Sequence, residues 1–311
     1  MRFLDVKTDY AFKRVFGAES SKSILISFLN AILEYEGEQA VVDLTIVDPW
    51  QIPLIQGMKD TFVDVKAVLN NGKRVIIEMQ VLNVAGLEQR ILHNAAKQYA
   101  TQLQRGEDYT LLNPVIAITF TDFTLFDDSA EHISRFRLIE RERFIEYGDD
   151  VELIFIELPK FQRDLEALRD IQDKWIYFIK NAGRLEYIPE TLGSDPAIRA
   201  AFEQINEAAM SLDELELQQK RHDFIAQQRG ALTLATHIGR AEGEAIGEAR
   251  GRAEGRAEGE AVGDARGKAE GRAEGERQKS LAIAAALLPS MPDAQIAQIT
   301  GLSLQDVVAL R

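Results

Sequence analysis

One stretch in the first hundred residues constrains the fold most, because it reads as two apolar strands joined by a tight turn. The sequence from Val63 to Val81 is VDVKAVLNNGKRVIIEMQV, with apolar residues on both sides of Asn-Asn-Gly. This pattern around a short glycine-containing loop predicts a β-hairpin. The hairpin nevertheless carries Asp64 on its first strand and Glu78 and Gln80 on its second. Carboxylates in the middle of core strands need a chemical reason, because burying a charge is costly.

The length of the turn decides which side chains are neighbours. A two-residue loop would pair Asp64 with Met79 and put Asp64 and Glu78 on opposite faces of the hairpin. A three-residue loop, Asn70-Asn71-Gly72, places glycine where a left-handed conformation forms a bulge. That register sets Asp64 directly opposite Glu78, with Cβ atoms about 5 Å apart.

Two carboxylates at that distance repel each other unless a cation lies between them or one is protonated. With Gln80 next along the same face, the group indicates an oxygen-donor site for a hard divalent ion, Mg²⁺ or Mn²⁺. A face that is simply half exposed to water is the alternative interpretation. It is supported by the mixed set of residues that share the face, namely Phe62, Lys66, Ile76 and Leu82.

The segments around the hairpin predict a mixed sheet flanked by helices. Apolar residues at helical spacing predict one or two helices over residues 8–33 with a break at Gly17, and a further helix from residue 87 to a glycine stop at Gly106. Strands are expected within residues 113–126 and 151–158, and an exposed strand over 134–144. This order of elements is typical of an α/β fold.

Four regions are expected along the chain. They are a core over residues 1–160, accessory helices over 161–236, a glycine repeat over 237–279 and a small helical hairpin over 280–311. The last segment has the spacing of a helix-turn-helix around Gly301. Its second helix offers no basic or amide-rich face beyond Gln305 and Arg311, so a cap or docking hairpin is favoured over DNA reading.

The repeat has a glycine at every fourth position from Gly239 to Gly275, ten in all. Each glycine in a helix interior costs about 1 kcal/mol relative to alanine, so ten cost on the order of 10 kcal/mol. A closely packed partner helix would offset this cost, which predicts self-association into a homo-oligomer. A frayed spacer is the alternative. A period of four exceeds the 3.6 residues of a helical turn, so a supercoil that follows the stripe should be right-handed.

Composition excludes several classes of site. The chain has no cysteine, which excludes disulfides and thiolate metal sites and favours a cytoplasmic location. No apolar run reaches the roughly 20 residues of a membrane span, so no membrane partner is expected. The four histidines show no zinc-hydrolase spacing, and no phosphate-binding glycine loop precedes a helix.

The net charge of −14 counts against a protein that simply coats DNA. The excess acid is concentrated in residues 111–236, which hold 24 acidic and 14 basic side chains. Residues 1–110 are near balance, with 14 acidic and 12 basic side chains.

A carboxylate on one strand, a hairpin, Glu-x-Gln at the end of an apolar strand and then a helix resemble the core of the PD-(D/E)XK nucleases. More specifically, the chain resembles the Rpn-type recombination-promoting nucleases, a transposase-related family of that superfamily. The segments that carry the resemblance are DVKTDYAFKRVFG, VDVKAVLNNGKRVIIEMQV, QRILHNAAKQYATQLQRGEDY, NPVIAITFTDF and LPKF, with the glycine-rich repeat and the closing ITGLS.

The resemblance implies roles for particular residues. Asp64 and Glu78 would hold the metal together with the backbone carbonyl of Met79, and Gln80 would occupy the place of the usual motif lysine. The missing cation is then sought on Lys97 of the following helix, in preference to Lys66. Supporting positions, by the same resemblance, are Asp9, Lys13, Arg90 and Tyr99, while Phe12 and Phe16 are expected to anchor the first helix in the core.

The resemblance implies a Mg²⁺-dependent DNA endonuclease, an enzyme that hydrolyses phosphodiester bonds in recombination or transposition. Phosphodiester hydrolysis needs a metal to generate hydroxide near neutral pH and to neutralise charge on the phosphate. The alternative is a noncatalytic, oligomeric DNA- or protein-binding module that keeps the nuclease fold. The missing motif lysine and the acidic charge favour that alternative, and the presence of both Asp64 and Glu78 opposes it.

Overall fold

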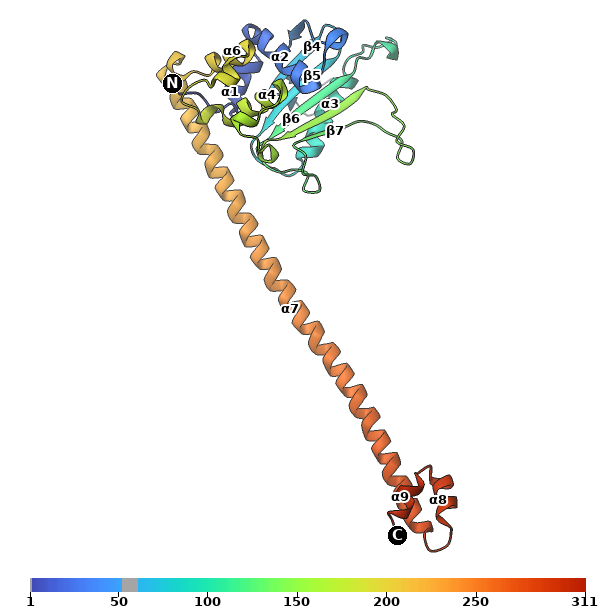
Figure 1. The fold of residues 1–311 in the computed structure, drawn as a ribbon. Coiled ribbons are helices and arrows are strands. Elements are labelled where there is room, and N and C mark those ends of the chain that lie inside the picture. Colours follow the sequence, from blue (N-terminus) through green and yellow to red (C-terminus); the bar gives the residue numbers. More distant parts are fainter. Residues whose placement is uncertain (1, 52–60) are drawn as a thin grey trace. The chain divides into compact units, whose positions relative to one another are not determined.

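The computed structural model describes residues 2–51 and 61–311, and the chain divides into two compact units, residues 1–231 and residues 232–311. The first unit is built on a six-stranded sheet with the strand order β1-β4-β5-β6-β8-β7 (Figure 1). Its strands are β1 (Leu44–Ile46), β4 (Val65–Leu69), β5 (Arg74–Gln80), β6 (Val115–Thr121), β7 (Ile133–Phe136) and β8 (Val151–Glu157). A separate antiparallel pair joins β2 (Trp50–Gln51) to β3 (Thr61–Phe62).

The sheet is mixed. Strands β5, β6 and β8 are parallel. Strands β4 and β7 pair antiparallel with β5 and β8, and β1 pairs antiparallel with β4. The predicted α/β class with a mixed sheet flanked by helices is therefore confirmed.

The hairpin adopts the three-residue loop. Val65 pairs with Ile77 and Val68 with Arg74, which is the register that brings Asp64 level with Glu78. Gly72 has φ +85°, and its N–H donates to the carbonyl of Leu69 at 2.9 Å. A left-handed residue at this third loop position is the bulged turn that the Asn-Asn-Gly sequence favours.

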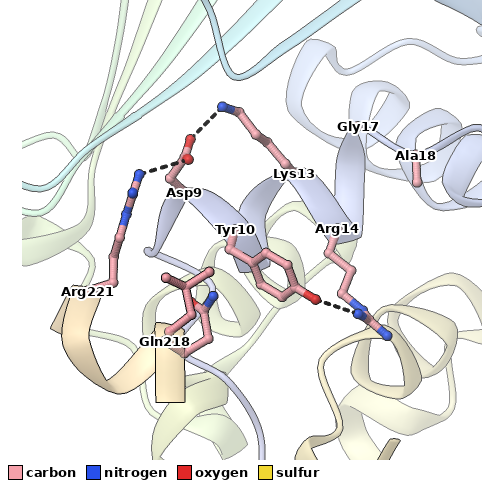
Figure 2. Close-up of a pocket in the computed structure, with 9 residues that line it drawn as sticks. Asp9, Tyr10, Lys13, Arg14, Gly17, Ala18, Gln218 and Arg221 are labelled. Atoms are coloured by element: carbon pink, nitrogen blue, oxygen red, sulfur yellow. Dashed lines mark hydrogen bonds and ion pairs between the residues drawn. The ribbon is translucent and has the colours of Figure 1, made fainter. Parts of the chain in front are cut away.

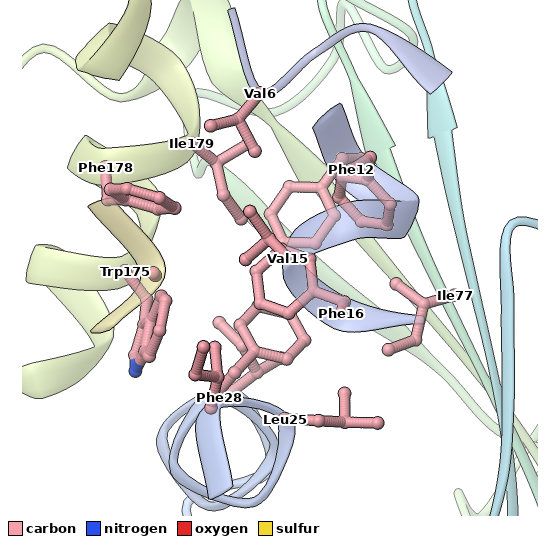
Figure 3. Packing of buried hydrophobic residues seen from close by; sticks show 14 of the residues in the cluster. Val6, Phe12, Val15, Phe16, Leu25, Phe28, Ile77, Trp175, Phe178 and Ile179 are labelled. Atoms are coloured by element: carbon pink, nitrogen blue, oxygen red, sulfur yellow. The ribbon is translucent and has the colours of Figure 1, made fainter. Parts of the chain in front are cut away.

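One face of the sheet carries the main core. Helices α1 (Asp9–Phe16), α2 (Lys22–Leu33), α4 (Ile171–Asn181) and α6 (Pro196–Gln204) contribute to it, and an aromatic cluster fills its centre (Figure 3). Phe16 lies between Phe28 and Trp175, with ring centroids 4.7 and 5.8 Å away. Phe12 and Phe16 are fully buried, as predicted.

The opposite face is covered by α3 (Leu87–Ala100). Ala95 of this helix packs with Ile76 of β5 and Ala117 of β6. The helix ends at Ala100, so the predicted stop at Gly106 was wrong. The Gln102 amide exchanges hydrogen bonds of 2.8 and 2.9 Å with the backbone of Asn113, and this draws the chain away from the helix.

The expected boundary at residue 160 is not a boundary in the structure. Trp175, Phe178 and Phe202 of the accessory helices are fully buried in the same core as the sheet. The predicted strand over 134–144 is shorter than expected: β7 ends at Phe136, and only an isolated bridge between Ile139 and Glu146 follows.

The remaining regular elements are helices and short 3₁₀ turns. Helix α5 (Glu190–Gly193) precedes α6, and α7 (Leu212–Leu287) contains the whole glycine repeat as continuous helix. In the second unit, α8 (Asp293–Thr300) and α9 (Leu304–Val308) pack Ile296 and Val307 against Ala284 of α7. Among the described residues, no helix is long and apolar enough to span a membrane. Short 3₁₀ turns lie at 19–21, 37–39, 109–111, 158–160, 165–167, 182–184 and 207–209.

Candidate active site

Glu78 lies near the end of β5, on the side of the sheet that α3 covers, and only 5% of it is exposed. The side-chain N–H of Asn94 on α3 donates to its Oε1 at 2.7 Å, and the Gln80 amide donates to its Oε2 at 3.0 Å. Burial raises the pKa of Glu78, while the Asn94 hydrogen bond, the charge of Arg90 and the Gln80 hydrogen bond oppose the rise. The carboxylate is thus desolvated and fixed in orientation.

Asp64 lies one residue before the start of β4, at the same end of the hairpin as Glu78. Its Oδ2 accepts a hydrogen bond from the backbone N–H of Met79 at 2.8 Å, and Lys13 Nζ lies 3.8 Å from its Oδ1. Burial raises the pKa of Asp64 to about 7; the Met79 hydrogen bond opposes this rise and the Asp9 carboxyl adds to it. Two partly dehydrated carboxylates, Asp64 and Glu78, therefore occupy neighbouring hairpin positions.

Helix α1 brings two of the predicted supporting residues to Asp64. Thr8 caps the helix by accepting from the N–H of Ala11, and Asp9 and Lys13 follow on one side of it. Their side chains form an ion pair of 2.7 Å. From α7, Arg221 reaches the other oxygen of Asp9 at 3.0 Å.

Arg90 approaches the second strand of the hairpin. Its guanidinium donates a hydrogen bond to Oε1 of Gln80, whose own amide holds Glu78. Gln80 stands where the motif lysine is expected. Its side-chain amide links the Arg90 guanidinium to the Glu78 carboxylate, so a positive charge lies next to the expected lysine position.

The two lysines considered from the sequence occupy the α3 side of the sheet. Lys97 is 5% exposed and lies one helical turn beyond Asn94. Lys66 is half-buried, pairs with Ile76 across the hairpin, and has its pKa lowered by burial and by the charge of Arg74.

Tyr99 lies at the other end of the parallel strands. Its hydroxyl donates to Asp150 at 2.8 Å, next to the start of β8. Val151 is aligned with Arg74, four residues before Glu78 on β5, so this end of the sheet is about 13 Å from the Glu78 level. The structure therefore brings Arg90 to the site but places Tyr99 away from it.

Sequence reasoning missed two contributors. Asn94 is fully buried against Glu78, and a signal was present because it follows Arg90 by four residues and so shares its helix face. Arg221 carries no local signal, since 212 positions separate it from Asp9.

The donor set fits a hard divalent ion. Within the described part of the chain, no three His, Cys, Asp or Glu side chains gather in a metal-binding group. A hard ion that keeps several of its waters needs only one or two carboxylates, and Asp64 and Glu78 supply these. Asn94 adds a second sign: its Oδ1 is buried without a hydrogen-bond partner, and it would accept a hydrogen bond from the water shell of such an ion.

One of three comparisons with known proteins gives a match. The profile described as PD-(D/E)XK nuclease family transposase matches residues 6–234, more than two thirds of the chain. No curated protein and no solved structure gives a significant match. Because the match covers most of the chain and the mixed sheet with flanking helices is consistent with that fold, the chain belongs to the PD-(D/E)XK nuclease family transposases.

Proposed function

We propose that this protein is a metal-dependent DNA endonuclease that hydrolyses phosphodiester bonds, acting in DNA recombination or transposition. The observation that supports it most is that two buried carboxyl groups, Asp64 and Glu78, lie level with each other at one end of the hairpin. Both carboxylates are desolvated at one end of the hairpin, which raises the pKa of each. An enzyme fold keeps such an arrangement at a free-energy cost, and a bound cation relieves it.

The ion would be Mg²⁺ or Mn²⁺, held by Asp64, Glu78 and the backbone carbonyl of Met79. When bound, the ion would act as a Lewis acid: it would lower the pKa of a bound water and neutralise charge on the phosphate. Asn94 and Gln80 fix the Glu78 carboxylate so that it need not reorganise when the ion binds.

The cation that replaces the motif lysine is Arg90 in this proposal. Gln80 holds its guanidinium beside Glu78, where it favours the developing negative charge of the reacting phosphate. Lys97 remains the second choice because it is buried on the same helix, one turn beyond Asn94. Lys13 and Asp9 support Asp64 in this proposal. Lys13 sets the orientation of the Asp64 carboxylate through the 3.8 Å contact between Lys13 Nζ and Asp64 Oδ1.

The proposed substrate is DNA and the proposed assembly is a homo-oligomer formed through α7. All ten repeat glycines have open space around them: apart from the chain neighbours and the nearby backbone of the helix itself, no heavy atom of the described residues lies within 4 Å of the position a Cβ would take. A second helix can therefore approach the backbone closely along this stripe. The cytoplasmic location stays a prediction from the cysteine-free sequence.

The test is plasmid cleavage by the purified protein in Mg²⁺, Mn²⁺ or EDTA. The matched variant carries Asp64→Ala and Glu78→Ala. Nicking that requires the metal and disappears in the variant is the expected result. Equal behaviour of the two proteins would show that the carboxylates do not carry the chemistry.

One observation favours a second candidate, a noncatalytic DNA- or protein-binding module. Gln80 is neutral, and its amide is already engaged by Glu78 and Arg90. In that case metal would bind without any cleavage, and DNA binding would be unchanged in the double variant.

A further inference from the structure

The first turns of α7, residues 212–231, belong to the same compact unit as the sheet. Within this stretch, the large apolar side chains that are not exposed are Leu215 and Ile225, and both are only half-buried. Two arginines, Arg221 and Arg229, instead contact segments on the two sides of the candidate active site. The first turns of α7 are therefore attached to the core largely by polar contacts.

Arg221 is linked to Asp64 through helix α1 (Figure 2). Its guanidinium donates to Oδ2 of Asp9 at 3.0 Å, and Lys13 Nζ lies 2.7 Å from the other oxygen of the same carboxylate. Lys13 Nζ also lies 3.8 Å from Oδ1 of Asp64. Arg221 thus holds the carboxylate that shares Lys13 with Asp64.

Arg229 contacts the hairpin where β5 ends. Its guanidinium donates to the carbonyl oxygen of Val81 from Nη2 at 3.2 Å and from Nε at 3.4 Å, and Nη2 also donates to Oδ2 of Asp122 at 2.6 Å. The backbone N–H of Asp122 in turn donates to the carbonyl oxygen of Gln80 at 2.9 Å. Arg229 and Asp122 together therefore hold two successive carbonyl groups, those of Gln80 and Val81.

The contact between Arg229 and Asp122 is part of a small charge network. The side chain of Asp122 is 15% exposed, and Lys7 Nζ lies 3.6 Å from the same oxygen that accepts from Arg229. An isolated surface ion pair contributes little to stability, whereas a network of partly buried charges is less screened by water. This network is therefore suited to fixing the end of β5.

The end of β5 matters because it determines the position of Gln80. The Gln80 side chain donates to Oε2 of Glu78 at 3.0 Å and accepts from Arg90. A shift of the backbone at this residue would change both hydrogen bonds. Removing a group that supports a metal ligand from outside typically lowers metal affinity or activity about 10–100-fold.

We propose that Arg221 and Arg229 are positioning residues that fasten the first turns of α7 to both sides of the candidate active site. Arg221 acts on Asp64 through the Asp9 carboxylate, and Arg229 acts on Glu78 through the end of β5. The proposal rests on the proposed function, because it takes the two carboxylates to be the metal site. It gives α7 a part in ordering that site, in addition to its proposed part in assembly.

The first experiment measures hydrogen–deuterium exchange of the full-length protein in EDTA, in peptides that cover residues 76–82 and 119–124. The variants are Arg229→Ala and the conservative Arg229→Lys. Arg240→Ala is the matched control, since it removes the same charge from α7 where the side chain is 79% exposed and pairs with Glu244. We expect about tenfold faster exchange in Arg229→Ala, partial rescue in Arg229→Lys, and less than a twofold change in the control.

The second experiment measures Mn²⁺ affinity of the same full-length proteins, and of Arg221→Ala, by isothermal titration calorimetry. We expect Arg221→Ala and Arg229→Ala each to raise the Kd for Mn²⁺ about tenfold and Arg240→Ala to change it less than twofold. Exchange and Mn²⁺ affinity in both variants that match those of Arg240→Ala would overturn the proposal, because the effect would then reflect overall charge alone.

Plasmid cleavage separates this proposal from the nuclease function. If cleavage requires Asp64 and Glu78 while the Arg221 and Arg229 variants bind Mn²⁺ and cut DNA like wild type, the nuclease stands and the positioning roles fall. If wild type cuts no DNA but binds Mn²⁺, and the two arginine variants weaken that binding, the positioning roles stand and the endonuclease falls. A wild-type protein that binds no Mn²⁺ contradicts both.

Discussion

At the level of single residues, the site holds two carboxyl groups, Asp64 and Glu78, whose charged forms are destabilised by burial. Asp64 and Glu78 are both removed from water, and the neighbouring amides and cations offset that cost only in part, since the pKa of each carboxyl stays raised. A carboxylate in this state gains more from a cation than an exposed one does. Two predictions follow from the groups that touch them.

Asp64→Asn should stabilise the metal-free protein at pH 8. The pKa of Asp64 is about 7 in the folded chain against 3.8 for the ordinary side chain. The folded state therefore keeps a proton that the unfolded state releases, and the free energy of unfolding falls as pH rises from about 4 to 7. The gain at pH 8 has an upper limit of about 4 kcal/mol. Thermal unfolding of both proteins at pH 4 and pH 8 measures it, and an equal difference at both pH values would contradict the assignment.

Arg90→Ala should lower the rate of DNA cleavage by about 10²-fold, because it removes the positive charge held at Gln80. Single-turnover cleavage by Arg90→Ala, Lys97→Ala and Lys66→Ala compares the candidate cations. Full activity of Arg90→Ala together with loss in Lys97→Ala would return the role to Lys97.

At the scale of elements, the hairpin turn sets the site. The three-residue loop sets the register that puts Asp64 level with Glu78, where its Oδ2 accepts a hydrogen bond from the Met79 N–H, and Gly72 supplies the positive φ of that loop. A Cβ on Gly72 would lie 2.4 Å from Oδ1 of Asn113 as well as requiring a positive φ.

Gly72→Ala should therefore lower the free energy of unfolding by about 1–3 kcal/mol. Gly106→Ala is the matched control, since Gly106 has φ +93° but open space around it. Thermal or urea unfolding of the two variants compares them. Equal losses would mean that the contact with Asn113 adds nothing to the backbone strain.

The sequence predicted local elements better than distant contacts. The Asn-Asn-Gly turn, the apolar strands and the buried Phe12 and Phe16 are all encoded within a few neighbouring residues. The early end of α3 depended on Gln102 meeting Asn113, and that contact forms only when the next strand is in place.

Contacts between segments far apart in the sequence could not be predicted, because no local sequence pattern encodes them. Arg221 reaches Asp9 across 212 positions, and Tyr10 hydrogen-bonds Glu214 at 2.6 Å across 204. Asp64 and Glu78 were predictable because one turn sets their spacing, whereas the contribution of α7 beside them depends on the folded core.

At the scale of the whole molecule, the glycine repeat is the feature that the nuclease core does not explain. It is continuous helix, and exposed i,i+4 ion pairs such as Arg240–Glu244 and Arg250–Glu254 support it. Such pairs contribute only about 0.3–0.5 kcal/mol each, well below the cost of one glycine. A partner helix would supply the remainder.

Replacing Gly251, Gly255, Gly259 and Gly263 by glutamine should convert the proposed oligomer to a monomer of 34.9 kDa, because the larger polar side chains keep a second helix away without creating an apolar stripe. The same four positions changed to alanine should keep the assembly and raise helix stability by about 1 kcal/mol each. Sedimentation velocity measures the mass of both. A monomeric wild-type protein would contradict self-association and support the spacer.

In the proposed nuclease, Glu78 and Asp64 would hold the metal that activates water for DNA hydrolysis, so the charge of Glu78 is essential. We would measure the rate of supercoiled plasmid nicking in Mn²⁺ by wild type and by Glu78→Gln. The variant keeps an oxygen for the Asn94 hydrogen bond, removes the charge and replaces the oxygen that accepts from the Gln80 amide with an NH₂ group. We expect nicking by wild type, none in EDTA, and a loss of at least 10²-fold in the variant. Nicking at the wild-type rate by Glu78→Gln would contradict it.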